Sequence, residues 1–127
     1  KYRYQLEMVQ RRAARFTLRR YRRLSSVSDM LKQLQWETLV DRRRRSRLVM
    51  FYKIQHQLVC VPIPSIVTRA PKPRPGYPHQ YLTTSGTDAY RNSYFPLAIK
   101  QWNALPPSIA CLDSLNSFKA DLSSHSF

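Results

Sequence analysis

Arginine is the residue type in this sequence that is most suited to binding a ligand. Of the 22 basic residues 16 are arginines, and 12 of the 22 lie in two short clusters, at residues 11–23 and 42–47. A guanidinium group donates two parallel hydrogen bonds to a phosphate and stacks on planar rings, whereas lysine acts as a point charge. The clusters therefore favour a nucleic-acid phosphate backbone over a merely solvated surface.

The positive charge is concentrated in the first half of the chain. Residues 1–59 hold 16 Lys and Arg against four acidic residues, a net charge of +12, whereas residues 60–127 hold six against three, a net charge of +3. Fields of this size attract polyanions over a range set by the ionic strength. We expect the binding surface to lie in the first half.

The first cluster lies within a helical apolar pattern. Leu6, Val9, Ala13 and Phe16 recur at spacings of three and four, which predicts a helix from about Tyr4 to Tyr21 with one buried face. Arginines at the same spacing predict an opposite, basic face. An ordinary solvated face is the alternative, but such faces mix both charges and only one acidic residue occurs here. The candidate phosphate-binding residues are Arg11, Arg12, Arg15, Arg19, Arg22 and Arg23.

Two capping boxes predict the next helices. Ser26 with Asp29 predicts a short helix, and Thr38 with Asp41 predicts a helix that ends near Leu58 or Val59. Trp36, in the connection between them, is expected in the core, with base stacking as an alternative.

The second cluster cannot occupy a single helix face. Successive residues turn by about 100°, so Arg42, Arg43, Arg44 and Arg45 nearly encircle the helix. Two interpretations stay open: salt bridges to Glu37 and Asp41, or contact with a ligand from several sides. Arg42, Arg43, Arg44, Arg45 and Arg47 are therefore candidate binding residues.

The second half begins with a proline-rich connector. Six of the nine prolines lie between residues 62 and 78 and exclude helix there, while Val67-Thr68 and Tyr81–Thr83 are candidate strands of a short β-hairpin. Beyond it, a helix over residues 97–105 ends at Pro106-Pro107, and a last short helix follows.

These patterns predict a mainly α fold, a small helical domain of four to five helices with an extended Pro-rich connector. We expect a basic three-helix segment at 1–61, the connector at 62–88, and a helical segment at 89–127 that packs on the first. The predicted core consists of Leu6, Val9, Phe16, Leu31, Leu34, Trp36, Leu48, Phe51, Phe95, Trp102, Leu105 and Phe118.

The residues needed for catalysis or metal binding are missing from the patterns. No carboxylates are paired, only two glycines occur, and His56-x-x-x-Cys60 lacks further zinc ligands. We expect no metal, no cofactor and no enzymatic activity of this chain alone. Cys60 and Cys111 are expected to be buried thiols of a reducing, intracellular compartment. No apolar run reaches the ~20 residues of a membrane span, so no membrane partner is expected.

Several strings follow one another in a specific order. They are Leu6–Phe16, Ser25–Leu31, Leu34–Leu39, Arg42-Arg43 with Leu48 and Phe51–Ile54, Ser93–Pro96, Ile99, Trp102–Pro106, and Ser114-Leu115 with Phe118-Lys119. Over nearly the whole chain, they resemble the C-terminal segment, thumb and post-thumb, of non-LTR (LINE-type) retrotransposon reverse transcriptases.

The resemblance implies a non-catalytic segment whose parent is an RNA-directed DNA polymerase with its catalytic residues upstream. The chain begins at Lys1 without a methionine, which also indicates a piece of a longer protein. The implied partners are an RNA or DNA backbone and the upstream polymerase region, in the cytoplasm and nucleus for an active element.

Three alternatives remain at this stage. One is a protein-docking module in which Trp36, Phe51 and Trp102 pack the joint with the parent polymerase. Another is a diverged, inactive retrotransposon remnant, since Leu97 stands where the family often has arginine. Binding of the basic helices to a membrane surface ranks last, because few large apolar residues border the arginine faces.

Overall fold

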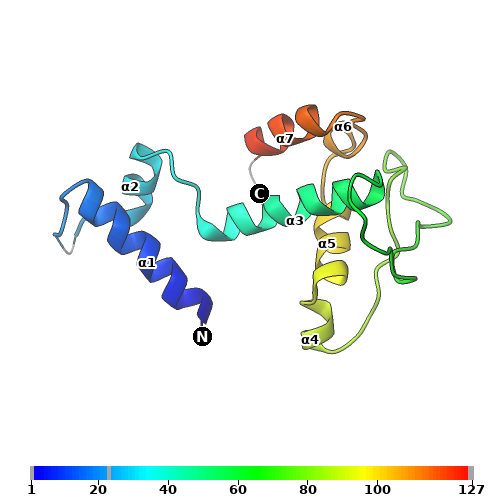
Figure 1. The fold of residues 1–127 in the computed structure, drawn as a ribbon, viewed down its shortest axis with the longest axis horizontal. Helices are drawn as coiled ribbons and strands as arrows, with labels where there is room; N and C mark the ends of the chain where they lie inside the picture. Colours follow the sequence, from blue (N-terminus) through cyan, green and yellow to red (C-terminus); the bar gives the residue numbers. More distant parts are fainter. Residues whose placement is uncertain (1, 23, 126–127) are drawn as a thin grey trace. The chain divides into compact units, whose positions relative to one another are not determined.

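The computed structural model describes residues 2–22 and 24–125, and these are mainly α-helical, as the sequence predicts (Figure 1). The described part contains seven helices rather than four to five. The two additional ones, α4 and α6, are single turns of four residues each. The helices are α1 (Tyr2–Thr17), α2 (Val27–Gln33), α3 (Leu39–Gln55), α4 (Asp88–Arg91), α5 (Tyr94–Asn103), α6 (Pro107–Ala110) and α7 (Leu115–Ser124).

The chain forms two compact units whose boundary lies within α3. Unit 1 is Lys1–Arg43 and unit 2 is Arg44–Phe127. The sequence pattern predicts a boundary at residue 61 instead, at the start of the prolines. The difference arises because most of α3 packs with the C-terminal helices and shares one core with them.

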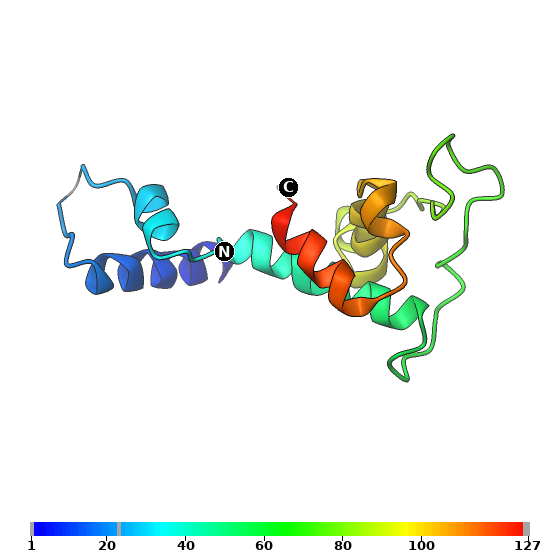
Figure 2. The ribbon, with the colours of Figure 1, turned by 90° about the horizontal axis from the view of Figure 1, so that it is seen from above.

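Unit 2 is built around stacked aromatic side chains. Phe51 of α3 meets Trp102 of α5 edge to face with ring centroids 5.4 Å apart, and Tyr52 stacks on Phe118 of α7 at 4.5 Å. Both views show α7 running alongside α3 (Figures 1 and 2). The predicted core residues Leu48, Phe51, Trp102, Leu105 and Phe118 are all buried here, and Phe95 packs at the edge of the same cluster.

Within unit 2, the proline-rich connector is tied to α5 by two adjacent side chains, Trp102 and Asn103, which we call the Trp-Asn pair. The Nε1–H of Trp102 donates to the carbonyl of His79 (3.2 Å). The side chain of Asn103 accepts from the N–H of Tyr81 (2.9 Å) and donates to its carbonyl (2.8 Å). In the described residues the predicted hairpin is reduced to one antiparallel bridge between Arg69 and Tyr81, with no strand.

Unit 1 has a much smaller core than the apolar pattern predicts. α1 packs against α2, and the buried hydrophobic residues of its described part are Ala14 and Met30. Leu6, Val9 and Phe16, predicted as core, are each more than half exposed. The prediction is wrong because helical spacing marks an apolar row whatever it faces, and the seven-residue α2 covers the Ala14 side instead.

The other core predictions in unit 1 hold only in part. Leu31 and Leu34 are half-buried, while Trp36 is exposed on the connection between α2 and α3. Trp36 lines a hollow on unit 1 together with Gln10, Gln35, Glu37, Leu39 and Arg42. It is therefore a surface residue of this unit, not the plug between helices that its size suggests.

Three helices end in the same way, without the usual glycine. Arg19, Gln35 and Gln57 have φ angles of 51°, 54° and 53°. After each of them the next N–H reaches back five residues, as from Arg20 to the Arg15 carbonyl (3.0 Å). This is the Schellman termination, in which a left-handed residue closes the helix. With only two glycines in the chain, arginine and glutamine take that position.

Candidate nucleic-acid interface

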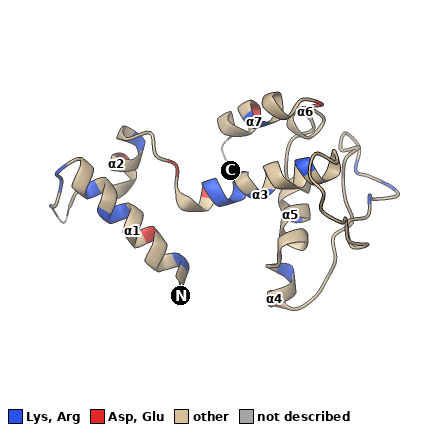
Figure 3. Ribbon diagram, in the orientation of Figure 1, with Lys and Arg blue, Asp and Glu red and all other residues tan. Residues whose placement is uncertain are grey.

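The first arginine cluster lies on α1 and on the turn that follows it. Figure 3 shows the basic residues along α1 and the segment after it. Arg11 and Arg12 are exposed on the helix and Arg15 is half-buried, while Arg19, Arg20 and Arg22 are exposed beyond the helix end. We call these six residues the α1 arginine surface. Arg23, also predicted to bind phosphate, lies outside the described residues.

The predicted helical register of this cluster is wrong in its second half. α1 ends at Thr17 rather than near Tyr21, so Arg19 and Arg22 do not continue the face of Arg11 and Arg15. In a longer helix the side chains of Arg15 and Arg19 would be neighbours on adjacent turns, where like charges repel. The left-handed Arg19 instead turns the chain out of the helix and spreads the charges.

Within residues 2–22 and 24–125, no hydrogen bond or ion pair engages the side chains of the α1 arginine surface. The acidic residues around it are few, because unit 1 holds 12 Lys and Arg against four Asp and Glu, a net charge of +8 over 43 residues. Unit 2 carries +7 over 84 residues, about half that charge per residue. These guanidinium groups are therefore available to an anionic ligand.

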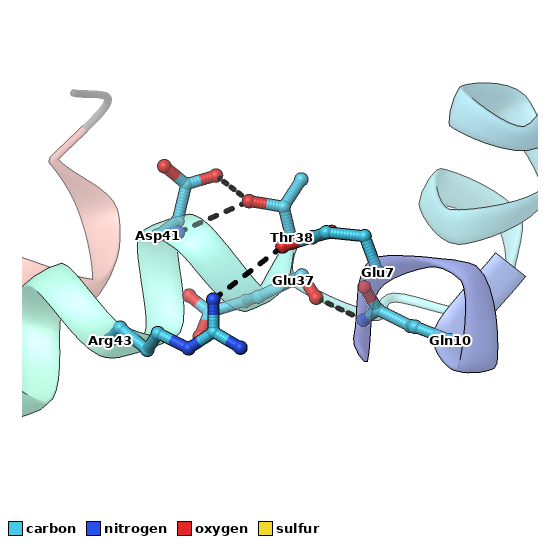
Figure 4. Close-up of polar contacts among 6 residues, drawn as sticks. All are labelled: Glu7, Gln10, Glu37, Thr38, Asp41 and Arg43. Carbon is cyan, nitrogen blue, oxygen red and sulfur yellow. Dashed lines mark hydrogen bonds and ion pairs between the residues drawn. The ribbon is translucent and has the colours of Figure 1, made fainter. Parts of the chain in front are cut away.

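The second cluster begins at a polar network inside unit 1. Arg43 pairs with Glu7 of α1 across 3.8 Å, and the Gln10 amide donates to the Glu37 carbonyl at 2.6 Å (Figure 4). Thr38 closes its capping box by accepting from the N–H of Asp41 (3.1 Å). Since these contacts join α1 to the start of α3, Arg43 stabilises the unit.

Two further arginines of α3, Arg45 and Arg47, are hydrogen-bonded inside unit 2. The Arg47 guanidinium donates to the Gln101 side chain (2.9 Å), and its carbonyl accepts from the Tyr94 hydroxyl (3.2 Å). Arg45 donates to the Ser123 carbonyl (3.3 Å), and Arg44 is half-buried with partners of its own. Of the five predicted residues on α3, Arg42 is exposed and the other four are half-buried.

Two features of the surface escape the sequence patterns. Arg20 is as exposed as its neighbours but falls outside the helical spacing that selected the others. The aromatic residues of α1 are also exposed. The sequence contains a signal for the exposure of these aromatic residues: the predicted second helix is short, and a seven-residue α2 covers α1 on one side only.

Three further expectations concern chemistry outside the arginines. Cys60 and Cys111 are exposed, so the prediction of buried thiols is wrong. No three His, Cys, Asp or Glu side chains of the described residues gather as metal ligands. Among the helices of residues 2–22 and 24–125, none has the length and apolar composition of a membrane span.

Comparison with protein-family models, with curated proteins and with solved structures gives no match to this chain.

Proposed function

We propose that this chain is a non-catalytic nucleic-acid-binding segment that holds a phosphate backbone with the α1 arginine surface. The observation that supports it most is the different use of the two arginine clusters. Arg43, Arg45 and Arg47 have partners within the chain, whereas the α1 arginine surface has none among the described residues. A cluster of arginines on one face without acidic partners is typical of surfaces that meet phosphates.

We infer that the parent protein is a LINE-type reverse transcriptase, because the ordered strings from Leu6 to Lys119 resemble its C-terminal segment. In that setting the ligand is RNA, an RNA–DNA duplex or target DNA. A sequence-independent grip suits a polymerase, whose template changes at every step. The α1 arginine surface provides charge without an arrangement for reading base edges.

The test is the salt dependence of oligonucleotide binding. Each phosphate neutralised by a protein contributes about 0.9 to the slope of log K against log salt on duplex DNA. We expect the triple variant Arg11/Arg15/Arg19→Ala to reduce the magnitude of that slope by about 2–3. It should weaken binding to RNA, to an RNA–DNA duplex and to a DNA duplex by similar factors.

The matched control is Lys72/Lys100/Lys119→Ala, which removes the same charge from exposed positions of unit 2. It should leave most of the slope in place. A slope near zero for the unaltered protein would overturn the proposal, as would equal losses in the two triple variants.

The protein-docking alternative loses two of its three anchors. Phe51 and Trp102 are buried against each other in unit 2, so they are not free to pack a joint with another protein. Trp36 alone remains on the surface.

A further inference from the structure

The aromatic residues of unit 1 are all on its surface. Tyr2 is 79% exposed, Phe16 74%, Tyr4 66%, Tyr21 65% and Trp36 39%. Of the nine aromatic residues described in unit 2, only Tyr90 is classed as exposed. Leaving five large rings in water while burying an alanine and a methionine is a poor way to stabilise a small unit. The rings therefore need another explanation.

Helical geometry places these rings beside the arginines. Phe16 follows Arg12 by four residues, so the two side chains are neighbours on adjacent turns of α1. Tyr4 shares a face with Arg11 and Arg15, which follow it after two and three turns. Beyond the helix, the N–H of Arg19 donates to the Phe16 carbonyl (3.2 Å), which keeps the basic turn near the ring.

We propose that unit 1 binds nucleic acid in single-stranded form, with unpaired bases stacked on Phe16 and Tyr4 while the neighbouring arginines hold the phosphates. This inference rests on the proposed function and names the form of its ligand. Stacking platforms combined with a positively charged track are how proteins hold single strands without reading sequence. Duplexes keep their base faces inside the stack, so exposed rings give them no additional contact.

The spacing of the rings fits a short stretch of strand. Twelve residues separate Tyr4 from Phe16, which is about 18 Å along the helix axis and about 120° around it. A strand that reaches both rings therefore crosses the exposed side of α1 obliquely, and at about 3.4 Å per nucleotide it needs at least about five nucleotides. Trp36 lies in the hollow that also contains Arg42, and it provides a further stacking position on unit 1.

The charge of unit 1 decides between nucleic acid and a protein partner. Exposed Leu6 and Val9 would also suit an amphipathic helix of another protein. However, such a partner has no need for arginines interleaved with rings at a net charge of +8 over 43 residues. A strand of phosphates and planar bases uses both features.

The experiment compares three 20-mers with the same number of phosphates in each strand, using the whole chain and fluorescence anisotropy. They are unpaired dT20, an abasic strand of the same length, and a DNA duplex. We expect dT20 to bind at least about fivefold more tightly than the abasic strand, since stacking of each base contributes on this scale.

The double variant Phe16→Leu/Tyr4→Leu should remove that preference for dT20 and leave abasic binding unchanged. Leu6→Ala, an exposed apolar position on the same helix, is the matched control and should keep the preference. Circular dichroism checks that each variant retains its helices.

The outcomes separate the two proposals. Equal affinity for dT20 and the abasic strand would overturn the stacking inference while leaving phosphate binding intact. No salt-dependent binding to any of the three would overturn the proposed function as well. Loss of dT20 preference in Leu6→Ala would point to a general apolar surface, as a protein partner requires, and would also overturn stacking.

Discussion

At the scale of single residues, Arg11 and Arg47 show how one side chain takes two roles. The half-buried Arg47 donates to the side chain of Gln101, 54 positions away, so its guanidinium group links α3 to α5. Arg11 lies on a helix that packs mainly against the seven-residue α2, and its side chain is exposed to water. The role of an arginine therefore follows from what its helix packs against, not from the density of arginines around it.

The left-handed residue after α3 leads to the first prediction. Gln57 has φ +53°, a conformation that costs a non-glycine residue about 1–2 kcal/mol. Replacing Gln57 by glycine removes that strain, partly offset by the greater freedom of glycine in the unfolded chain. We expect the free energy of unfolding in urea to rise by about 0.5–1 kcal/mol.

The control for Gln57→Gly lies two residues earlier. Gln55→Gly, at the last residue of α3, is expected to lower the free energy of unfolding by up to about 1 kcal/mol, because glycine is a poor helix former. A loss of stability in Gln57→Gly would show that the Schellman ending of α3 does not form.

The second prediction concerns His79 in the connector. Burial, followed by the charges of Arg69 and His56, lowers the pKa of His79 below 6.5. The Nδ1 of His79 lies 3.3 Å from the Arg69 guanidinium, a contact that requires the neutral ring. The folded state thus favours neutral His79, and this contribution is present above pH 6.5 and is lost as the pH falls through the lowered pKa.

We therefore expect the melting temperature of unit 2 to fall between pH 7.5 and the lowered pKa of His79. His79→Gln keeps an acceptor for Arg69 but does not titrate, so its melting temperature should depend less on pH over that range. His125→Gln, at the C-cap of α7, is the control and should keep the pH dependence of the unaltered protein. An unchanged pH profile in His79→Gln would contradict the prediction.

At the scale of elements, the starts of helices were easier to predict than their ends. Ser26 with Asp29 and Thr38 with Asp41 act within three residues, so the sequence contains the whole signal, and both caps are confirmed. The ends at Arg19 and Gln57 carry no glycine, so the predicted helices extend too far. The apolar row of α1 was assigned to a core because its spacing says nothing about its neighbour.

The link between the connector and α5 could not be predicted, because its partners lie more than 20 residues apart. Trp102 and Asn103 each hydrogen-bond the backbone of the proline-rich segment, and Tyr81 enters the core against Phe51. Proline composition alone predicts an extended chain. A backbone without neighbouring strands needs side-chain partners once it is buried, and the Trp-Asn pair provides them.

The third prediction tests this attachment with Asn103→Asp. A carboxylate still accepts from the Tyr81 N–H but cannot donate to the Tyr81 carbonyl, and it repels that oxygen. We expect a loss of about 1–3 kcal/mol in local stability. Hydrogen exchange should accelerate at the amide of Tyr81, which donates to Asn103, and at the amides of Ala70 and Leu82, which donate to backbone carbonyls of the same connector.

Asn116→Asp, at an exposed position of α7, introduces the same charge and serves as the control. It should leave exchange at those three amides unchanged. Equal acceleration in both variants would mean that added charge, not the lost donor, loosens the connector.

At the scale of the whole molecule, the two units differ in what holds them together. Unit 2 buries interlocking rings from α3, α5 and α7, so it has the core of an ordinary small domain. The described part of unit 1 buries two hydrophobic residues under a net charge of +8. Self-repulsion and a small core both lower its stability, and phosphates that neutralise the arginines would relieve the repulsion. The proposed function therefore implies that binding of phosphates stabilises the folded form of unit 1.

The fourth prediction follows from this stabilisation. We expect amides of α1 and α2 to exchange faster than those of α3 and α5 in the free protein, and to slow markedly when dT20 is added. Any ligand that binds the folded state stabilises it by mass action, and the proposed function places the ligand on unit 1. In Arg11/Arg15/Arg19→Ala the same addition of dT20 should leave exchange in α1 nearly unchanged. Slower exchange confined to unit 2 would show that dT20 binds unit 2 and would contradict the prediction. Fast exchange in α1 at saturating dT20 would show that binding does not stabilise the fold of unit 1.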